Sequence, residues 1–276
     1  REKDSNALKE KTPSRNYSPN KTSNSLVLYA YMLGPMLIEV KRIAIGLLLL
    51  ATLVPGAIAS GNSQFEVLAT LERSGAQPMG SLVEHSSTAL FGTTISGGSL
   101  NYGTVFRVDE TDGITILHSF SSIDGTAPTA GLTEASNSVL YGTTAEGGLH
   151  GFGTAFKITP EGSFSKLIDF TGETGAAKGS VPNGLALHAN GSLYGTTQSG
   201  GANASGTLFS INPDSGILTT LAEFSGANGP TPGRNPIGTV IARDDLLYGL
   251  TQNGGDSNNG VYFGISIAGT PTLSRS

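Results

Sequence analysis

The chain has 276 residues, with 39 glycines, 13 prolines and only 13% charged residues, and it contains no cysteine and no tryptophan. This composition is typical of many short strands joined by tight turns, and the missing cysteines exclude disulfide bonds and thiolate metal sites. The formal net charge is −5, and an acidic chain argues against nucleic acid as a partner, because phosphates demand clustered lysine and arginine.

The N-terminal segment 1–35 is polar, begins with arginine and shows no hydrophobic periodicity. Such a segment cannot bury enough apolar surface to fold alone. We therefore expect residues 1–35 to be a disordered upstream segment that precedes the first structured part of the chain.

Residues 36–59 have the three parts of a secretory signal peptide. Lys41 and Arg42 precede the apolar run 43–54, and the small residues that follow Pro55 offer a cleavage site after Ala59. The apolar run is 12 residues long, whereas a membrane-spanning helix needs about 20. Met36 is the natural start, with Met32 as the alternative. We expect a secreted, extracellular or cell-surface protein, or a periplasmic one, with no membrane span after cleavage.

Cleavage makes the remaining chain more acidic. Residues 1–59 hold eight basic and four acidic residues, so 60–276 retain eight basic and 17 acidic residues, a net charge of −9. This balance also argues against an anionic membrane surface as a partner.

Residues 60–276 contain a phrase that recurs four times. An aromatic residue and a glycine open each copy, 50, 53 and 54 residues apart, at Phe91-Gly92, Tyr141-Gly142, Tyr194-Gly195 and Tyr248-Gly249. Self-similarity at such a period indicates a repeat architecture. The predicted units cover about 79–120, 130–170, 183–224 and 237–276.

Each unit contains four runs with strand character. In the second unit these are 131–134, 139–144, 153–158 and 164–170, separated by turn residues and by a loop with a Gly-Gly pair. Four antiparallel strands in about 52 residues are typical of a β-propeller blade. A β-solenoid is the alternative, although its coils of about 20–30 residues fit four strands badly. The sequence predicts an all-β, β-propeller-like array of four blades.

Ring closure stays open at this stage. The last unit stops short of a full copy, and residues 65–71 read as an extra outer strand without a blade of its own. This strand either pairs with the last blade and closes the ring or belongs to a missing unit, so an incomplete ring is an alternative.

The in-register copies of Tyr-Gly-Thr-Thr, Gly-Gly and Gly-Thr-apolar-Phe resemble the bacterial GloVer-type tandem repeat of choice-of-anchor surface and secreted proteins. The resemblance covers about residues 65–276. The fourth copy departs from the pattern, with Leu250 for the first threonine and Val261-Tyr262 for Thr-Val. The resemblance implies an extracellular β-propeller-like array and no catalytic residues.

Other motifs favour structural readings. The histidines His85, His118, His150 and His188 occupy different repeat positions, so we expect no metal site from them. Two oxygen-rich loops, 109–113 and 256–259, offer only weak calcium sites, because neither has an established ligand spacing and turn chemistry explains both.

The Gly-Gly pairs fit turns that need positive φ better than phosphate loops. The repeated tyrosines fit a core between blades better than a sugar-stacking surface.

The variable residues of the loops between strands two and three, and of the long connections between units, are the candidates for a ligand face. They are Asp124, His150, Glu173, Lys178, Arg234 and Asp256. The sequence offers no catalytic set, which favours a non-catalytic binding or adhesion protein for a saccharide or a surface protein. A polysaccharide hydrolase or lyase on the same face is one alternative, and a structural spacer or gene fragment is the other.

Overall fold

The structure, a computed structural model, describes residues 70–71, 75–85, 89–109, 113–227 and 229–269 and the backbone of 271–275. The chain divides into two units, Arg1–Phe65 and Glu66–Ser276, and all described residues belong to the second. The expected disordered segment 1–35, the expected signal peptide 36–59 and most of the expected strand 65–71 lie outside the described residues.

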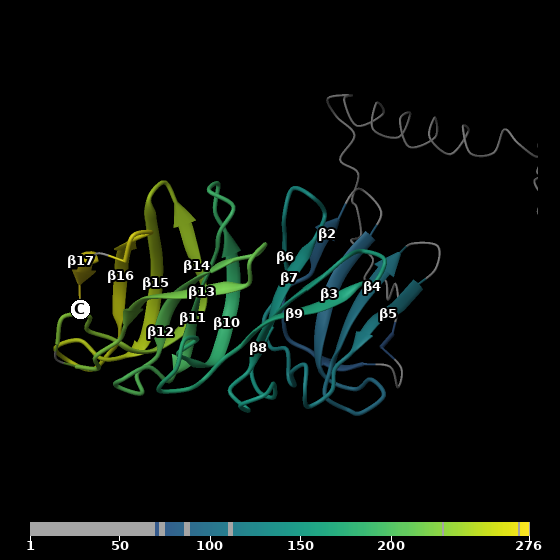
Figure 1. Ribbon diagram of the computed structural model, residues 1–276, viewed down its shortest axis with the longest axis horizontal. Helices are drawn as coiled ribbons and strands as arrows, with labels where there is room; N and C mark the ends of the chain where they lie inside the picture. Colours follow the sequence, from purple (N-terminus) through teal and green to yellow (C-terminus); the bar gives the residue numbers. More distant parts are fainter. Residues whose placement is uncertain are drawn as a thin grey trace, which may run out of the picture. The chain divides into compact units, whose positions relative to one another are not determined.

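All regular elements among the described residues are β-strands, and they form four antiparallel sheets (Figure 1). We call these sheets blades 1 to 4 in chain order. The all-β array of four blades that the sequence predicts is therefore confirmed.

The strands of the four blades have the following bounds. Blade 1 contains β1 (Ala76–Pro78), β2 (Val83–His85), β3 (Ala89–Ser96), β4 (Thr104–Asp109) and β5 (Gly113–Ser119). Blade 2 contains β6 (Thr133–Glu134), β7 (Leu140–Thr144), β8 (Thr154–Ile158) and β9 (Phe164–Asp169). Blade 3 contains β10 (Ser180–Leu187), β11 (Leu193–Ser199), β12 (Thr207–Asn212) and β13 (Ile217–Glu223). Blade 4 contains β14 (Arg234–Arg243), β15 (Leu246–Asn253), β16 (Val261–Ser266) and β17 (Pro271–Arg275).

Blade 1 has five strands because its first strand is split. Both β1 and β2 pair with β3, β1 at the end near Ser96 and β2 at the end near Ala89. In blade 3 the single strand β10 covers both regions of β11, with an irregularity between Pro182 and Leu185. The two short strands of blade 1 therefore take the place of one bulged strand.

The outer position of blade 4 is filled from within the blade. The strand order is β14-β15-β16-β17, and Phe263 of β16 pairs with Ser274 of β17. This outer position is the one that a strand over 65–71 would take in the closed ring considered above.

The motif glycine of each blade has a direct packing role. A side chain on Gly92, Gly142 or Gly195 would meet the ring of the phenylalanine opposite it on the next strand, since a built Cβ lies 2.5–2.6 Å from the ring's Cζ atom. The tip of the phenylalanine ring thus occupies the space that a side chain on the glycine would need, and this explains why the two residues recur together. The phenylalanines are Phe106, Phe156 and Phe209.

Each blade has two apolar faces. We call the face on the side of the preceding blade the leading face and the face on the side of the following blade the trailing face. In blade 3 the leading face carries Leu185, Leu193, Phe209 and Ile211, and the trailing face carries Tyr194, Leu208 and Ala222. Three hydrophobic clusters of this kind fill the spaces between adjacent blades. The motif tyrosines Tyr141 and Tyr194 are buried in two of them.

A second link between blades, which we call the proline joint, is made by the connections. The Cδ atom of a proline fills the space next to a loop glycine of the preceding blade, in the pairs Gly103–Pro128, Gly153–Pro182 and Gly206–Pro236. The residue before each proline has a positive φ of 52–55° and donates its N–H to a carbonyl just before that glycine, at 3.0–3.2 Å. These donors are Ala127, Val181 and Asn235.

Candidate functional site

The loops between the second and third strands have one shape in all four blades. Both glycines of every Gly-Gly pair have positive φ, as the sequence predicts. In each loop the later glycine donates its N–H to the carbonyl of the first glycine of the pair, as Gly153 does to Gly147 at 3.0 Å. The same bond recurs at Gly103, Gly206 and Gly260 at 3.1–3.2 Å. The backbone of these loops is therefore fixed by the fold.

The connections before blades 2 and 3 are hydrogen-bonded to the loops on both sides of them. Gly148 donates its N–H to Ser122 of the connection before blade 2, at 2.9 Å, and Ala127 of that connection donates to Tyr102 of the preceding loop, at 3.0 Å. Gly201 donates likewise to Gly172, at 3.1 Å. The loops and connections therefore lie at one end of the blades, which we call the loop face.

Two carboxylates brace the loop face from the outer strands. Asp169 accepts the backbone N–H of Leu149 at 2.7 Å and pairs with Lys166 at 2.9 Å. Glu223 accepts the N–H of Ala202 and pairs with Lys178 at 2.6 Å. Burial alone would raise the pKa of Glu223, but the bonds from Ala202 and Lys178 outweigh it and hold this pKa below its ordinary value.

The candidate residue Asp124 likewise has structural partners. It accepts the N–H and the hydroxyl of Ser121 at 2.6 and 2.8 Å and lies 3.0 Å from Nε2 of His118. The ring of His118 stacks on Phe164 of blade 2, with centroids 3.8 Å apart. Burial lowers the pKa of His118 below its ordinary value, against the opposing effect of the Asp124 carboxylate.

The six candidate residues predicted from the sequence are therefore of two kinds. Asp124 and Lys178 are tied to His118 and Glu223, and their bonds hold the face in shape. His150, Glu173 and Arg234 are exposed and make no side-chain hydrogen bond or ion pair with described residues, and Asp256 is exposed as well. These exposed residues come from different blades, and they remain predicted ligand contacts.

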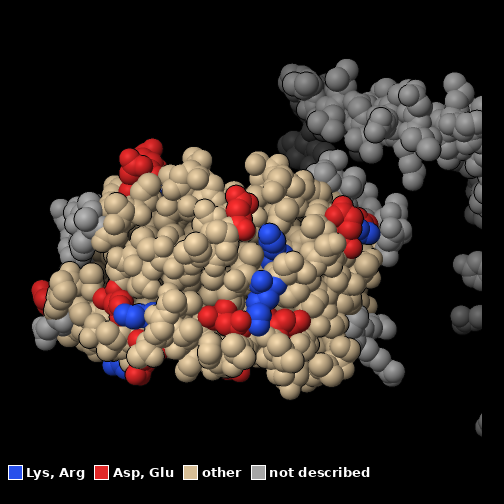
Figure 2. Space-filling view, viewed as in Figure 1, with Lys and Arg blue, Asp and Glu red and all other residues tan. Residues whose placement is uncertain are grey.

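The charge on the surface is dispersed. In the view of Figure 2 most of the surface is uncharged, and acidic and basic side chains lie in small mixed groups. Within the described residues no cluster of three histidine or acidic side chains is arranged to hold a metal ion. The described chain also contains no helix of the length and apolar character required to cross a membrane.

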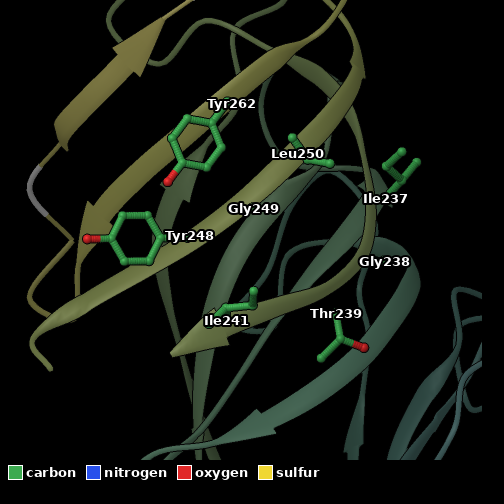
Figure 3. Close-up of a pocket in the computed structure, with 8 residues that line it drawn as sticks. All are labelled: Ile237, Gly238, Thr239, Ile241, Tyr248, Gly249, Leu250 and Tyr262. Atoms are coloured by element: carbon green, nitrogen blue, oxygen red, sulfur yellow. The ribbon is translucent and has the colours of Figure 1, made fainter. Parts of the chain in front are cut away.

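A second feature, missed in the sequence, is an open apolar pocket on the trailing face of blade 4. Its volume is about 380 Å³, and Figure 3 shows Tyr248 and Tyr262 side by side on adjacent strands with Leu250 near them. The two tyrosine rings are nearly parallel, at 5°, with centroids 6.1 Å apart. The remaining lining residues are Ile237, Gly238, Thr239, Ile241 and Gly249. The sequence shows that Leu250 and Tyr262 depart from the repeat pattern, but it does not show that both side chains lie on the same exposed face of blade 4.

Comparison with solved structures shows a propeller fold. An ulvan lyase of polysaccharide lyase family PL25 has a TM-score of 0.50 with 8% identity, over 76% of this chain and 59% of that one. TolB from Acinetobacter baumannii has a TM-score of 0.44 with 15% identity, and a putative 6-phosphogluconolactonase from Bacteroides uniformis has 0.45 with 16%. The matches cover 74% and 72% of this chain, but only 43% of TolB and 57% of the lactonase.

Sequence comparison identifies the repeat itself. No curated protein matches the chain in sequence. The Gloeobacter/Verrucomicrobia repeat matches residues 56–184 and again residues 176–275, which together span all four blades. The repeating unit described above is thus the unit of that family, and the chain belongs to the Gloeobacter/Verrucomicrobia repeat family.

Proposed function

We propose that this chain is a secreted or cell-surface binding module without catalytic activity, which holds a saccharide or a surface protein on its loop face. The observation that carries the proposal is that each of the first two connections is bonded to the loops on both sides of it. In the first connection these bonds are Gly148 to Ser122 and Ala127 to Tyr102. Exposed side chains on loops that a rigid scaffold fixes are the usual location of binding residues.

The chemistry of the exposed residues supports a polar ligand without strong net charge. His150 and Arg234 donate hydrogen bonds, whereas Glu173 and Asp256 accept them, and all four are exposed. A ligand with many hydroxyl groups matches such a mixture better than a polyanion, which would require clustered cations.

Secretion is proposed from residues 36–59, whose order of charges, apolar run and small residues is that of a signal peptide. Expression of the chain in a bacterial host with N-terminal sequencing of the exported product tests this point. The expected N-terminus is Ser60. A product that stays in the cytoplasm with residues 36–59 intact would contradict secretion.

The binding test compares two triple variants on a panel of neutral and acidic polysaccharides. In the first, His150, Glu173 and Arg234 of the loop face become alanine. In the control, Asn190, Asp214 and Glu161, which are exposed in turns away from the loop face, become alanine. For any polysaccharide that binds, the loop variant should raise Kd by about tenfold or more, and the control should change it by less than about twofold.

The same panel separates the alternatives. If both variants bind like the parent chain, the loop face is not the binding site. Turnover of a polysaccharide by the folded chain would mean an enzyme, and the ulvan lyase likeness supports no more than a shared fold. A folded chain that binds no polysaccharide of the panel would exclude these saccharides as ligands and leave a surface protein or a structural spacer role.

A further inference from the structure

Blade 4 exposes on its trailing face the positions that the other blades bury. Leu250 is 52% exposed, whereas Thr196 at the same repeat position is 1% exposed. Tyr262 is 49% exposed, whereas its counterpart Leu208 is fully buried. The trailing face of blade 4 is therefore an interblade surface that no described residue covers, and at these two positions its side chains are larger than those of blade 3.

Blade 1 exposes the complementary surface on its leading face. Leu82 packs next to Gly92 as Leu185 packs next to Gly195, but Leu82 is 53% exposed and Leu185 is 2% exposed. Leu90 is only partly buried, whereas Leu193 at the same position is fully buried. Among the described residues, the array thus presents a free leading face at one end and a free trailing face at the other.

The two ends also carry the two halves of a proline joint. Gln77 precedes Pro78 and has a φ of 58°, the conformation found before the three joint prolines. Gly260 has a φ of 97° and corresponds to the three joint glycines, but no proline of the described part of the chain lies beside it, whereas Gly206 has Pro236 next to it. Pro78 and Gly260 therefore have the geometry of a joint that is not made within the described residues.

The two free faces also carry charged residues at the positions of an ion pair between blades 1 and 2. His85 of blade 1 pairs with Glu134 of blade 2 at 2.5 Å. Strand pairing places Arg243 of blade 4 at the repeat position of His85, and Glu84 of blade 1 at the position of Glu134. Arg243 is 80% exposed with Asp244 at 3.9 Å as its ion-pair neighbour, and Glu84 is exposed. A blade 1 docked on blade 4 would bring Arg243 and Glu84 together as an ion pair.

We propose that two copies of this chain close one ring, with blade 1 of each copy packed against blade 4 of the other. The interface is heterologous, like those between successive blades, and two such contacts related by a twofold axis complete a ring of eight blades. Eight blades lie within the range of about 4–8 known for propellers. The ring leaves neither free face open.

The chemistry of the pocket favours a second copy over a polar ligand. Its walls are Ile237, Ile241, Leu250 and two tyrosine rings, with few polar groups to orient a sugar. Exposed apolar patches of this kind mark protein interfaces. The leading face of blade 1 offers the matching proline, leucine and carboxylate in Pro78, Leu82 and Glu84.

The first test measures the mass of the purified chain by sedimentation equilibrium between about 1 and 100 μM. The proposal expects a complex of two chains. Leu250→Asp should weaken association by at least about tenfold, and it should leave the fold intact because the side chain is exposed. Ile217→Asp is the matched control, because Ile217 is also an exposed strand residue, at 64%, but lies on neither free face. This control should still associate as two chains.

The second test uses charge reversal and mixing. Arg243→Glu and Glu84→Arg each place like charges at both contacts, so each variant alone should dissociate at lower concentration than the parent. A one-to-one mixture of the two variants contains one reversed pair and one native pair, so the mixed complex should regain association. Closure of a ring within one chain would give no such rescue.

Three results would overturn the proposal. One is a single-chain mass at every concentration. Another is a two-chain complex that survives both Leu250→Asp and Leu82→Asp. The last is an open polymer that grows with concentration, because it would show that the two contacts do not close a ring.

Discussion

The Cδ atom of Pro182 occupies the space that a side chain on Gly153 would need. A Cβ built on Gly153 would lie 2.7 Å from that atom and would also collide with the carbonyl oxygen of Thr144. Gly153 belongs to blade 2 and Pro182 to blade 3, so the contact joins two blades through a residue without a side chain. Steric fit at one glycine therefore sets how closely the two blades approach.

Gly153→Ala should lower the free energy of unfolding by about 3 kcal/mol or more, because the backbone cannot move away without opening the joint. Gly151→Ala in the same loop is the control. Gly151 also has a positive φ, of 79°, but a Cβ there would meet nothing within 4 Å, so the expected loss is about 1 kcal/mol. Urea unfolding of both variants checks the difference, and equal losses would show that the proline contact has no energetic role.

Val181→Asn should stabilise the chain by about 1 kcal/mol. Val181 is β-branched and has a φ of 55°, and Asn235 holds the equivalent position with a φ of 53°. Asparagine tolerates this left-handed conformation better than a branched side chain does. Val181→Thr keeps the branch and should bring no gain, and a thermal melt of the two variants separates these outcomes.

The paired threonines of one blade should differ in their contribution to stability. The Thr144 hydroxyl accepts the backbone N–H of Thr154 at 3.0 Å, and both side chains are fully buried. Thr144→Val should cost about 1–3 kcal/mol, since it leaves that N–H unpaired. Thr154→Val removes the hydroxyl bonds to the Asp124 carbonyl and to the Thr144 hydroxyl, both at 2.9 Å, but leaves the N–H of residue 154 bonded to Thr144. Val261 holds this position in blade 4, so the cost should be about 0.5–1.5 kcal/mol. The reverse order in urea unfolding would contradict this assignment.

Stability should fall when the pH drops below 6.5, through His118. Burial lowers the pKa of this histidine in the folded chain from its ordinary value of 6.5, so the unfolded chain binds the proton more readily. The stabilisation is therefore complete above pH 6.5 and is lost as the pH falls through the lower pKa of the folded state. His118→Gln keeps a donor toward Asp124 without titrating, and it should lose less stability than the parent between about pH 7.5 and 5.5. Identical pH profiles would contradict this role for His118.

The strands were predictable because their signals are local. In blade 2 the sequence predicts strands over 139–144, 153–158 and 164–170, and the structure has them at Leu140–Thr144, Thr154–Ile158 and Phe164–Asp169. Alternating apolar residues and turn glycines define such strands without tertiary information. The split of the first strand of blade 1 was not predicted, because β1 and β2 are only three residues each.

The contacts between blades were not predictable, because they depend on pairs far apart in the chain. The positive φ of Val181 has no signature in the sequence, since a branched residue is among the least expected there. Lys178 was predicted as a ligand contact, but its ammonium pairs with Glu223, 45 residues later. The sequence shows that Lys178 is charged and lies in a connection that differs between repeats. It does not show that Glu223, at the end of a distant strand, lies beside it.

The proline joint makes the length of the array easy to change. Each repeat brings its own proline for the blade before it and its own glycine for the blade after it, as Pro182 and Gly206 do in blade 3. A gene duplication that copies one repeat would therefore add a blade with both of its joints already compatible, and a deletion of one repeat would leave the flanking halves able to meet. Growth and shortening by whole blades need no compensating substitutions, so we expect relatives of this chain to differ in blade number more readily than in the fold of a blade.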